Sequence, residues 1–224
     1  MTIAENIQTI KNDLPDQVKM IAVSKTKPVA DILQAYNAGQ RRFGENKAQE
    51  LASKYPVLPD DIEWHFIGHL QSNKIKYIAP FVALIHSVDS LKLLEEINRE
   101  AIRNQRIISC LLQFHIAEEE TKFGLSEEEA KDILTSNTYK NLKNIRIIGV
   151  MGIATFTEDE RQVRKEFCHL KSIFTGLKTR FFQDEDTFCE LSMGMSDDYL
   201  MAIEEGSTMV RIGSSIFGAR NISK

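Results

Sequence analysis

The sequence contains few cysteines, and their spacing excludes the structures that cysteines usually build. Cys110, Cys168 and Cys189 lie far apart, with no Cys-x-x-Cys pair and no cluster with histidine. A disulfide framework needs paired cysteines, and a zinc site needs clustered cysteine and histidine ligands. We therefore expect neither a disulfide nor a metal site, and we interpret the three cysteines as ordinary buried thiols.

Long apolar runs and long blocks of basic residues are also missing. No apolar stretch approaches the roughly 20 residues that a membrane-spanning helix needs, and the segment 1–19 is polar. The chain has 28 basic and 32 acidic residues, a net charge of −4. This balance argues against a nucleic-acid or membrane-surface binder. We expect a cytoplasmic protein that acts on a small molecule.

What the sequence does contain is a regular alternation of short apolar runs with longer amphipathic stretches. This pattern is typical of βα units around a parallel sheet, and no glycine-, serine- or proline-rich linker interrupts it. The predicted strands lie near Lys19–Ser24, Arg42–Glu45, Glu63–Ile67, Ala83–Val88, Ile107–Ile116, Ile145–Ile153, Phe188–Ser192 and Met209–Ile212. Eight units, preceded by a helix around Thr2–Asn12, predict a single-domain (β/α)8 TIM barrel over residues 1–224.

Several helix starts carry recognisable signals. Pro28 is placed for a first helical turn, and capping-box patterns occur at Ser126-x-x-Glu129 and Thr157-x-x-Glu160. A doubly wound open sheet has the same local periodicity as a barrel and stays an alternative. In both architectures, reactive groups lie at the carboxyl ends of the strands.

Lys25 follows the first predicted strand at such a carboxyl end, in the segment Val23-Ser24-Lys25-Thr26-Lys27-Pro28. A lysine at the mouth of an apolar site is desolvated, so its amine is easier to deprotonate and can condense with an aldehyde. Most lysines at strand ends simply point into water. The functional interpretation of Lys25 therefore needs support from other residues.

Two loops near the C-terminus combine glycine and serine in the pattern of an anion site. Gly213 and Ser214 follow the last strand and open a short helix, and Ser192, Gly194 and Ser196 repeat the arrangement one unit earlier. Helix N-termini and serine hydroxyls donate to phosphate, and α/β barrels frequently bind phosphate with the loops after strands seven and eight. Capping of the following helices by the serines explains the same residues without a ligand.

Arg211 lies inside the otherwise apolar last strand, and a buried arginine needs an acceptor. That acceptor is either a carboxylate on an adjoining strand, such as Glu190, or the ring nitrogen of a ligand. An amine at Lys25, a phosphate anchor and an arginine together match the requirements of pyridoxal 5′-phosphate (PLP).

Six ordered motifs cover nearly the whole chain: Ala22-Val23-Ser24-Lys25-Thr26-Lys27-Pro28, Arg42-Phe43-Gly44-Glu45-Asn46, Trp64-His65-Phe66-Ile67-Gly68, Leu70-Gln71-Ser72-Asn73-Lys74, Leu191-Ser192-Met193-Gly194-Met195-Ser196-Asp197-Asp198 and Met209-Val210-Arg211-Ile212-Gly213. With these motifs the chain resembles the YggS/PROSC family of pyridoxal phosphate homeostasis proteins, which is related to the barrel domain of alanine racemase. The resemblance implies a PLP-binding barrel similar to fold type III.

The resemblance also implies roles for individual residues. Lys25 carries PLP as an internal aldimine, and Arg211 faces the pyridine nitrogen. The residues expected around the phosphate are Ser192, Ser196, Gly213 and Ser214. Asn46 and His65 stand at ends of predicted strands and are second-rank candidates for the ring or its 3-hydroxyl, although a structural histidine is the more common finding.

Two further lysines in the motifs receive weaker predictions. Lys27 is expected to point away from the cofactor. Lys74 is expected either to approach the cofactor mouth or another anion, or to be a solvated lysine at a helix start.

The resemblance implies a PLP carrier in intracellular PLP (vitamin B6) and amino-acid homeostasis, without established turnover. A permanent charge at Arg211 disfavours protonation of the pyridine nitrogen and weakens the cofactor as an electron sink. PLP-dependent apoenzymes are candidate partners, nucleic acid and membrane are not expected as partners, and a monomer is expected.

The alternatives are a single-domain amino-acid racemase and a phosphate-binding barrel that does not use pyridoxal. A two-base racemase needs an acid-base group on each face of the cofactor. Alanine racemase takes the second group from a further domain of its partner subunit, and this chain ends at Lys224, just after the predicted barrel. Tyr199 or His65 would then have to be the second base.

Overall fold

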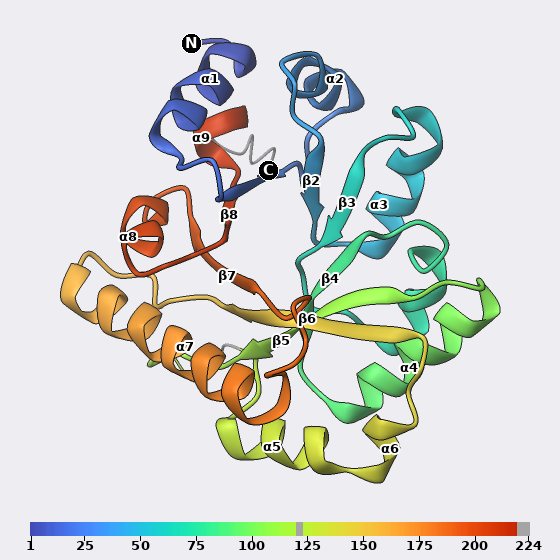
Figure 1. The fold of residues 1–224 in the computed structure, drawn as a ribbon. Helices are drawn as coiled ribbons and strands as arrows, with labels where there is room; N and C mark the ends of the chain where they lie inside the picture. Colours follow the sequence, from blue (N-terminus) through green and yellow to red (C-terminus); the bar gives the residue numbers. More distant parts are fainter. Residues whose placement is uncertain (120–122, 219–224) are drawn as a thin grey trace.

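The computed structural model describes residues 1–119 and 123–218. Its parallel strands close into a barrel in which each strand pairs with the next and β8 pairs with β1 (Figure 1). The strands are β1 (Lys19–Val23), β2 (Arg42–Glu45), β3 (Glu63–Phe66), β4 (Leu84–Val88), β5 (Ile108–Phe114), β6 (Ile145–Gly152), β7 (Glu190–Met195) and β8 (Met209–Ile212). The closed barrel confirms the predicted fold, and the open sheet is wrong.

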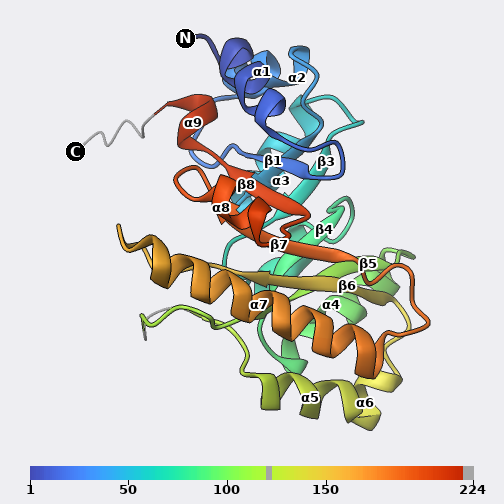
Figure 2. The ribbon, with the colours of Figure 1, turned by 60° about the vertical axis from the view of Figure 1, so that its left-hand side comes forward.

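Helices surround the barrel and connect its strands (Figures 1 and 2). The α-helices are α1 (Ile3–Asp13), α2 (Val29–Asn37), α3 (Ala48–Lys54), α4 (Leu91–Arg103), α5 (Glu127–Thr135), α6 (Asn137–Lys140), α7 (Glu160–Phe181), α8 (Tyr199–Glu204) and α9 (Ser214–Phe217). Two 3₁₀ segments, η1 (Tyr55–Val57) and η2 (Ser72–Tyr77), lie between β2 and β4. The predicted extra helix before the first strand is α1, which packs beside α2 and α9.

Apolar side chains fill both faces of the barrel wall, as expected for parallel strands covered by helices. Between the wall and the helices, Phe43, Phe66 and Phe167 are buried, and each contributes about 1.5–3 kcal/mol by leaving water. A separate cluster of buried residues comes from strands only and fills the interior: Ile21, Leu84, Leu111, Met151 and Met209. This packing supports the carboxyl ends of the strands, where the candidate site lies.

Local details correct some of the expected element boundaries. The capping box of Ser126 and Glu129 is present. The Thr157 capping box is wrong, because the Asp159 side chain caps α7 and accepts from two backbone N–H groups. Pro28 is the N-cap of α2 rather than a residue of its first turn.

The strand expected to end at Ser192 continues as β7 to Met195. Gly194 has φ +93°, which lets the strand bend and continue past it. Its lack of a side chain is also needed for packing, since a Cβ there would lie 2.6 Å from the Cβ of Ala202.

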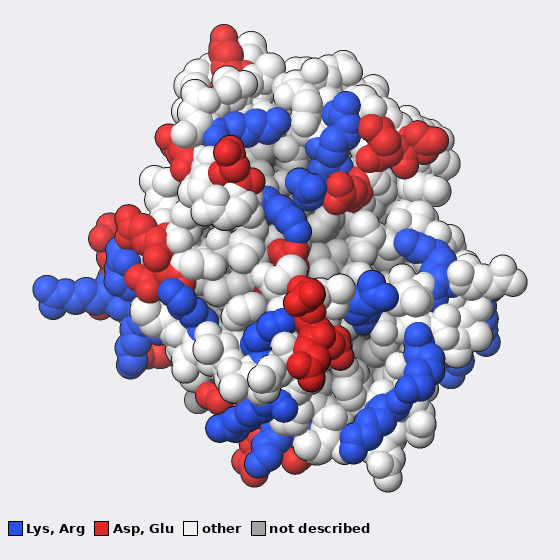
Figure 3. All heavy atoms as spheres, viewed as in Figure 1, with Lys and Arg blue, Asp and Glu red and all other residues white. Residues whose placement is uncertain are grey.

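Surface properties bear on the expectations drawn from composition. Cys110 is buried, but Cys168 and Cys189 are exposed, so the expectation of three buried thiols is wrong. Within the described residues, no helix combines the length and apolar character needed to cross a membrane. Basic and acidic side chains are interspersed over the face that Figure 3 shows.

Candidate functional site

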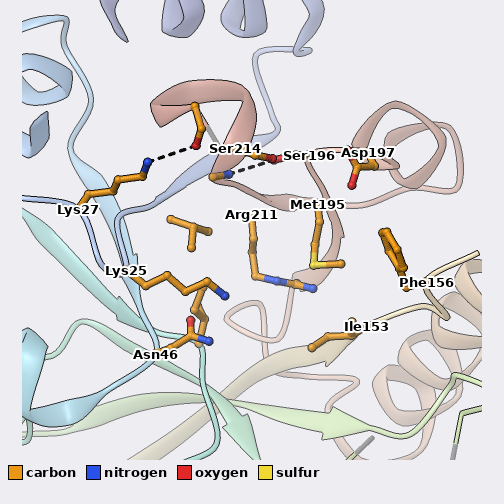
Figure 4. A pocket seen from close by; sticks show the side chains of 14 residues that line it. Lys25, Lys27, Asn46, Ile153, Phe156, Met195, Ser196, Asp197, Arg211 and Ser214 are labelled. Carbon is orange, nitrogen blue, oxygen red and sulfur yellow. Dashed lines mark hydrogen bonds between the residues drawn. The ribbon is translucent and has the colours of Figure 1, made fainter. Parts of the chain in front are cut away.

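A cavity of about 280 Å³ opens at the carboxyl ends of the strands, where the loops after β1, β2, β6, β7 and β8 meet. Lys25, Asn46, Ser196, Arg211, Gly213 and Ser214 line it together. In Figure 4, Lys25 extends across the cavity with Asn46 beside it, and Ser196 and Ser214 lie on the opposite side of Arg211 from Asn46. The structure thus brings six of the eight predicted site residues to one cavity.

Lys25 lies two residues after the end of β1, in a loop with a tightly defined backbone. The N–H of Ser24 donates to the carbonyl of Gly44 at 3.0 Å, which continues the pairing of β1 with β2. Thr26 has φ +65°, a left-handed conformation that is uncommon for a β-branched residue. The loop therefore reverses direction sharply, and the Lys25 amine enters the cavity (Figure 4).

Arg211 is 4% exposed and is held by two hydrogen bonds. Its Nη1 donates to Ser192 Oγ at 2.7 Å, and its Nη2 donates to the carbonyl of Gly152 at 2.9 Å. Burial lowers the pKa of Arg211 to about 10, so the guanidinium remains charged at neutral pH. Glu190 is not its partner, because that carboxylate bonds to Lys19 and to Thr208.

The loops after β7 and β8 are joined through Ser196. Its Oγ accepts a hydrogen bond from the N–H of Gly213 at 3.1 Å. Neither Ser196 nor Ser214 is the N-cap of the helix that follows its own strand, because the N-caps of α8 and α9 are Asp198 and Gly213. Ser196 Oγ instead accepts from the N–H of Ser215, in the first turn of α9, at 3.5 Å. Hydroxyl and N–H donors at this junction are suited to bind phosphate.

Gly213 also approaches the β1 side of the cavity closely. A Cβ at this position would lie 3.3 Å from the Cβ of Val23, which is tighter than ordinary van der Waals contact. The absence of a side chain therefore lets the β8 loop lie against β1, next to the loop of Lys25.

Ser192 and His65 do not line the cavity. Ser192 is fully buried beneath Arg211, and its Oγ lies 3.1 Å from His86 Nδ1. His86 Nε2 in turn lies 2.8 Å from His65 Nδ1. Burial lowers the pKa of His65 to about 3 and that of His86 well below its usual value, so both rings are neutral. These residues form a buried hydrogen-bonded chain that holds Arg211 from below.

His86 is a residue that sequence reasoning missed. The available signal was a histidine inside the apolar strand Leu84–Val88, since a buried polar group needs a partner. Ile153 and Phe156 were also missed, because no role was assigned to the loop after β6. Both line the cavity, and Figure 4 shows Ile153 opposite Lys25.

Asn46 lies between two cavities. Its Oδ1 is buried and has no hydrogen-bond partner among the described residues, so it can accept a hydrogen bond from a bound ligand. A smaller cavity of about 200 Å³ lies on its other side, and Lys74 lines that one rather than the cavity of Lys25. Lys27 was expected to point away, yet it lies at the rim of the main cavity and donates to the carbonyls of Phe217 and Gly218.

The residues present fit PLP. Lys25 offers an amine for the aldehyde, Arg211 a charged partner for the ring nitrogen, and the Ser196–Gly213 junction donors for the phosphate. The partnerless Asn46 Oδ1 is an acceptor for a hydroxyl group such as the 3-hydroxyl of the ring.

Comparisons with known proteins agree with this geometry. The family model for the alanine racemase N-terminal domain matches residues 1–221. The chain is 39% identical to the pyridoxal phosphate homeostasis protein of Pasteurella multocida, with 100% of both chains covered. It is 40% identical to that of Aquifex aeolicus, over 90% of this chain and 87% of the relative.

Among solved structures, PipY of Synechococcus elongatus with PLP bound has a TM-score of 0.87 and 35% identity. The alignment covers 97% of this chain and 100% of PipY. The chain therefore belongs to the alanine racemase N-terminal domain family and, within it, to the pyridoxal phosphate homeostasis proteins.

Proposed function

We propose that this protein binds PLP as a Schiff base on Lys25 and takes part in intracellular PLP (vitamin B6) and amino-acid homeostasis. The observation that carries the proposal is that one cavity joins Lys25, Arg211 and the Ser196–Gly213 junction. The curated relatives are named for PLP homeostasis, and PipY was solved with PLP bound.

Different residues of the chain bind different parts of PLP. The Lys25 amine provides the covalent attachment, for which PLP supplies the aldehyde. The hydroxyls of Ser196 and Ser214 donate to the phosphate, and the hydrogen bond from the Gly213 N–H holds Ser196 in place for this. Arg211 provides a fixed positive charge for the ring nitrogen, because Ser192 and the Gly152 carbonyl hold its guanidinium in place.

Holding the cofactor is favoured over turnover by the positions of the acid-base groups. Arg211 stays charged at neutral pH and disfavours a proton on the ring nitrogen. Of the two candidate second bases of a racemase, Tyr199 donates to Asp13 at 3.2 Å, and His65 is buried against His86. Neither lines the cavity that holds Lys25.

The proposal extends to the setting in which the protein acts. PLP-dependent apoenzymes are proposed as recipients of the cofactor, and the protein is proposed to be a monomeric single domain in the cytoplasm. Two observations support a small-molecule role: the net charge of −4, and the lack of a long basic block in the sequence.

Borohydride reduction after incubation with PLP tests the attachment. We expect an intact-mass increase of one reduced PLP and a modified peptide that contains Lys25. Lys25→Ala should give no adduct, whereas Lys131→Ala, at an exposed position of α5, should behave like the native chain. An unmodified Lys25 peptide in the native chain would overturn the proposal.

Turnover is tested separately, with the PLP-loaded protein in D₂O and L-alanine or L-serine. We expect no rapid exchange of the α-proton. Rapid exchange would favour the racemase and contradict a carrier without turnover.

A further inference from the structure

A buried ionic cluster lies beside the loop of Lys25, and none of the functions above uses it. The Lys54 cluster consists of Glu45, Glu50 and Lys54. Lys54 ends α3, and its Nζ lies 2.7 Å from Glu45 Oε1 and 2.7 Å from Glu50 Oε1. Lys54 is 7% exposed, and Glu45 is fully buried at the end of β2. The cluster therefore fixes α3 to the carboxyl end of β2.

The Lys54 cluster bonds to the main chain on both sides of Lys25. Before Lys25, the carbonyl of Ser24 accepts from Lys54 Nζ at 2.9 Å, and the hydroxyl of Ser24 donates to Glu45 Oε1 at 2.6 Å. After Lys25, the N–H of Thr26 donates to Glu50 Oε1 at 2.6 Å. The two residues that flank Lys25 are thus hydrogen-bonded to the same cluster.

The backbone at Thr26 needs such support. Its φ of +65° is strained for a β-branched residue, and strain of this kind persists only where surrounding contacts impose it. The hydrogen bond from Thr26 N–H to Glu50 is one such contact. Because Lys54 holds the Glu50 carboxylate in place, the ammonium acts on the loop indirectly as well as through Ser24.

The composition of the Lys54 cluster argues for positioning rather than for stability alone. Two carboxylates share one ammonium, and burial raises the pKa of Glu45 despite its bonds to Lys54 and Ser24. Apolar side chains of similar size would often stabilise a fold as well as buried ions do. What the ions add is direction, since each hydrogen bond fixes an angle as well as a distance.

We propose that Lys54 and Glu50 are positioning residues for Lys25: they hold the main chain on either side of it so that its amine enters the cavity. This inference rests on the proposed attachment of PLP to Lys25. It predicts that damage to the Lys54 cluster slows the attachment without removing any group that contacts the cofactor.

Lys54→Met tests the proposal, because methionine keeps an unbranched apolar stem and removes the ammonium. Timed borohydride quenching should show attachment about tenfold slower than in the native chain, as misplacement of a reacting group predicts. Hydrogen exchange of the Thr26 amide, measured without PLP, should be faster. Lys131→Met is the matched control at an exposed position and should leave both unchanged. Native values for both measurements in Lys54→Met would overturn the proposal.

Glu50 provides a second test that does not depend on whether Lys54→Met folds. Glu50→Gln keeps an oxygen that can accept from Thr26 N–H, whereas Glu50→Ala removes the acceptor. We expect attachment rate and Thr26 protection to stay close to native in Glu50→Gln and to fall in Glu50→Ala. Equal behaviour of the two variants would contradict the positioning role.

Failure of the positioning role can be distinguished from failure of the proposed function. If the native chain forms no adduct at Lys25, the attachment itself is wrong. The exchange of the Thr26 amide in the cofactor-free variants still decides whether the Lys54 cluster holds the loop.

Discussion

Two buried polar arrangements support the cavity from different sides, and they use different chemistry. On the β1–β2 side, the Lys54 cluster consists of ionisable groups around one ammonium and holds main-chain atoms around Lys25. On the β4–β7–β8 side, His86 and Ser192 are neutral and hold one charged side chain, that of Arg211. A loop with a strained backbone is fixed by charges, whereas a guanidinium that is itself charged is fixed by neutral acceptors.

The contrast follows from the cost of burying charge. Arg211 already brings one positive charge into the barrel interior, and charged histidines beside it would add repulsion to the cost of desolvation. On the other side, the single ammonium of Lys54 offsets part of the charge of the two carboxylates that it contacts. The two arrangements should therefore differ in how they respond to mutation and to acid.

Removal of Glu45 should have the largest effect on stability. Glu45→Ala takes away one carboxylate partner of Lys54 and the acceptor of the Ser24 hydroxyl, and we expect a loss of about 3–5 kcal/mol in the free energy of unfolding. Urea unfolding measures this loss.

The double variant Glu45→Ala, Lys54→Met should recover part of the loss, because no ammonium is then left without its Glu45 partner. A double variant whose loss of stability equals the sum of the two single losses would contradict a paired cluster.

Acid should weaken the histidine side. The folded-state pKa of His65 is about 3, below its unfolded value near 6.5, so the unfolded state binds the proton first. Stability from this group is present above about pH 6.5 and is lost as pH falls toward the folded pKa. Between pH 7 and pH 5 the native chain should lose about 2 kcal/mol more than His65→Gln, which does not titrate.

The Lys54 cluster should respond to acid with the opposite sign. Because the folded pKa of Glu45 is raised, the folded state binds a proton before the unfolded state does as pH falls. The pH-dependent part of the Glu45 contribution to stability is therefore present at low pH and is lost as pH rises through the raised folded pKa. Urea unfolding of Glu45→Gln against the native chain at pH 4 and pH 7 measures this contribution, and a reversed sign would contradict it.

Substitution of Arg211 should affect PLP binding more than the fold. Arg211→Lys keeps a positive charge. An ammonium, however, does not reproduce the planar guanidinium that donates to Ser192 Oγ and to the Gly152 carbonyl at the same time. We expect about tenfold weaker PLP binding by equilibrium dialysis, equal to about 1.4 kcal/mol. The matched control is Arg146→Lys, at an exposed position of β6, which should bind as the native chain does.

An exposed ion pair should show the smallest effect. Arg42 Nε lies 3.0 Å from Glu63 Oε2 across β2 and β3, and the two side chains are 37% and 48% exposed. Glu63→Gln should change the free energy of unfolding by less than about 1 kcal/mol. A loss as large as that of Glu45→Ala would show that burial does not explain the difference between the two pairs.

Much of the fold followed from local patterns. Short apolar runs and amphipathic stretches alternate along the chain, and this order predicted the strands and the added helix α1. Closure into a barrel did not follow from periodicity, because an open sheet has the same pattern. It depends on the pairing of β8 with β1, which joins segments at opposite ends of the chain.

The sequence by itself determined that Lys25 follows the first strand and that Ser196 and Gly213 follow the last two, since chain order and strand ends are local properties. The tertiary structure alone decided that Ser192 lies beneath Arg211 and Ser196 beside Gly213. The physical reason is that strands buried on both faces have no polar side to show which residues point inward, and a shift of one residue reverses every side chain. The Lys54 cluster was hidden for a related reason: its partners meet only when β1, β2 and α3 are packed together.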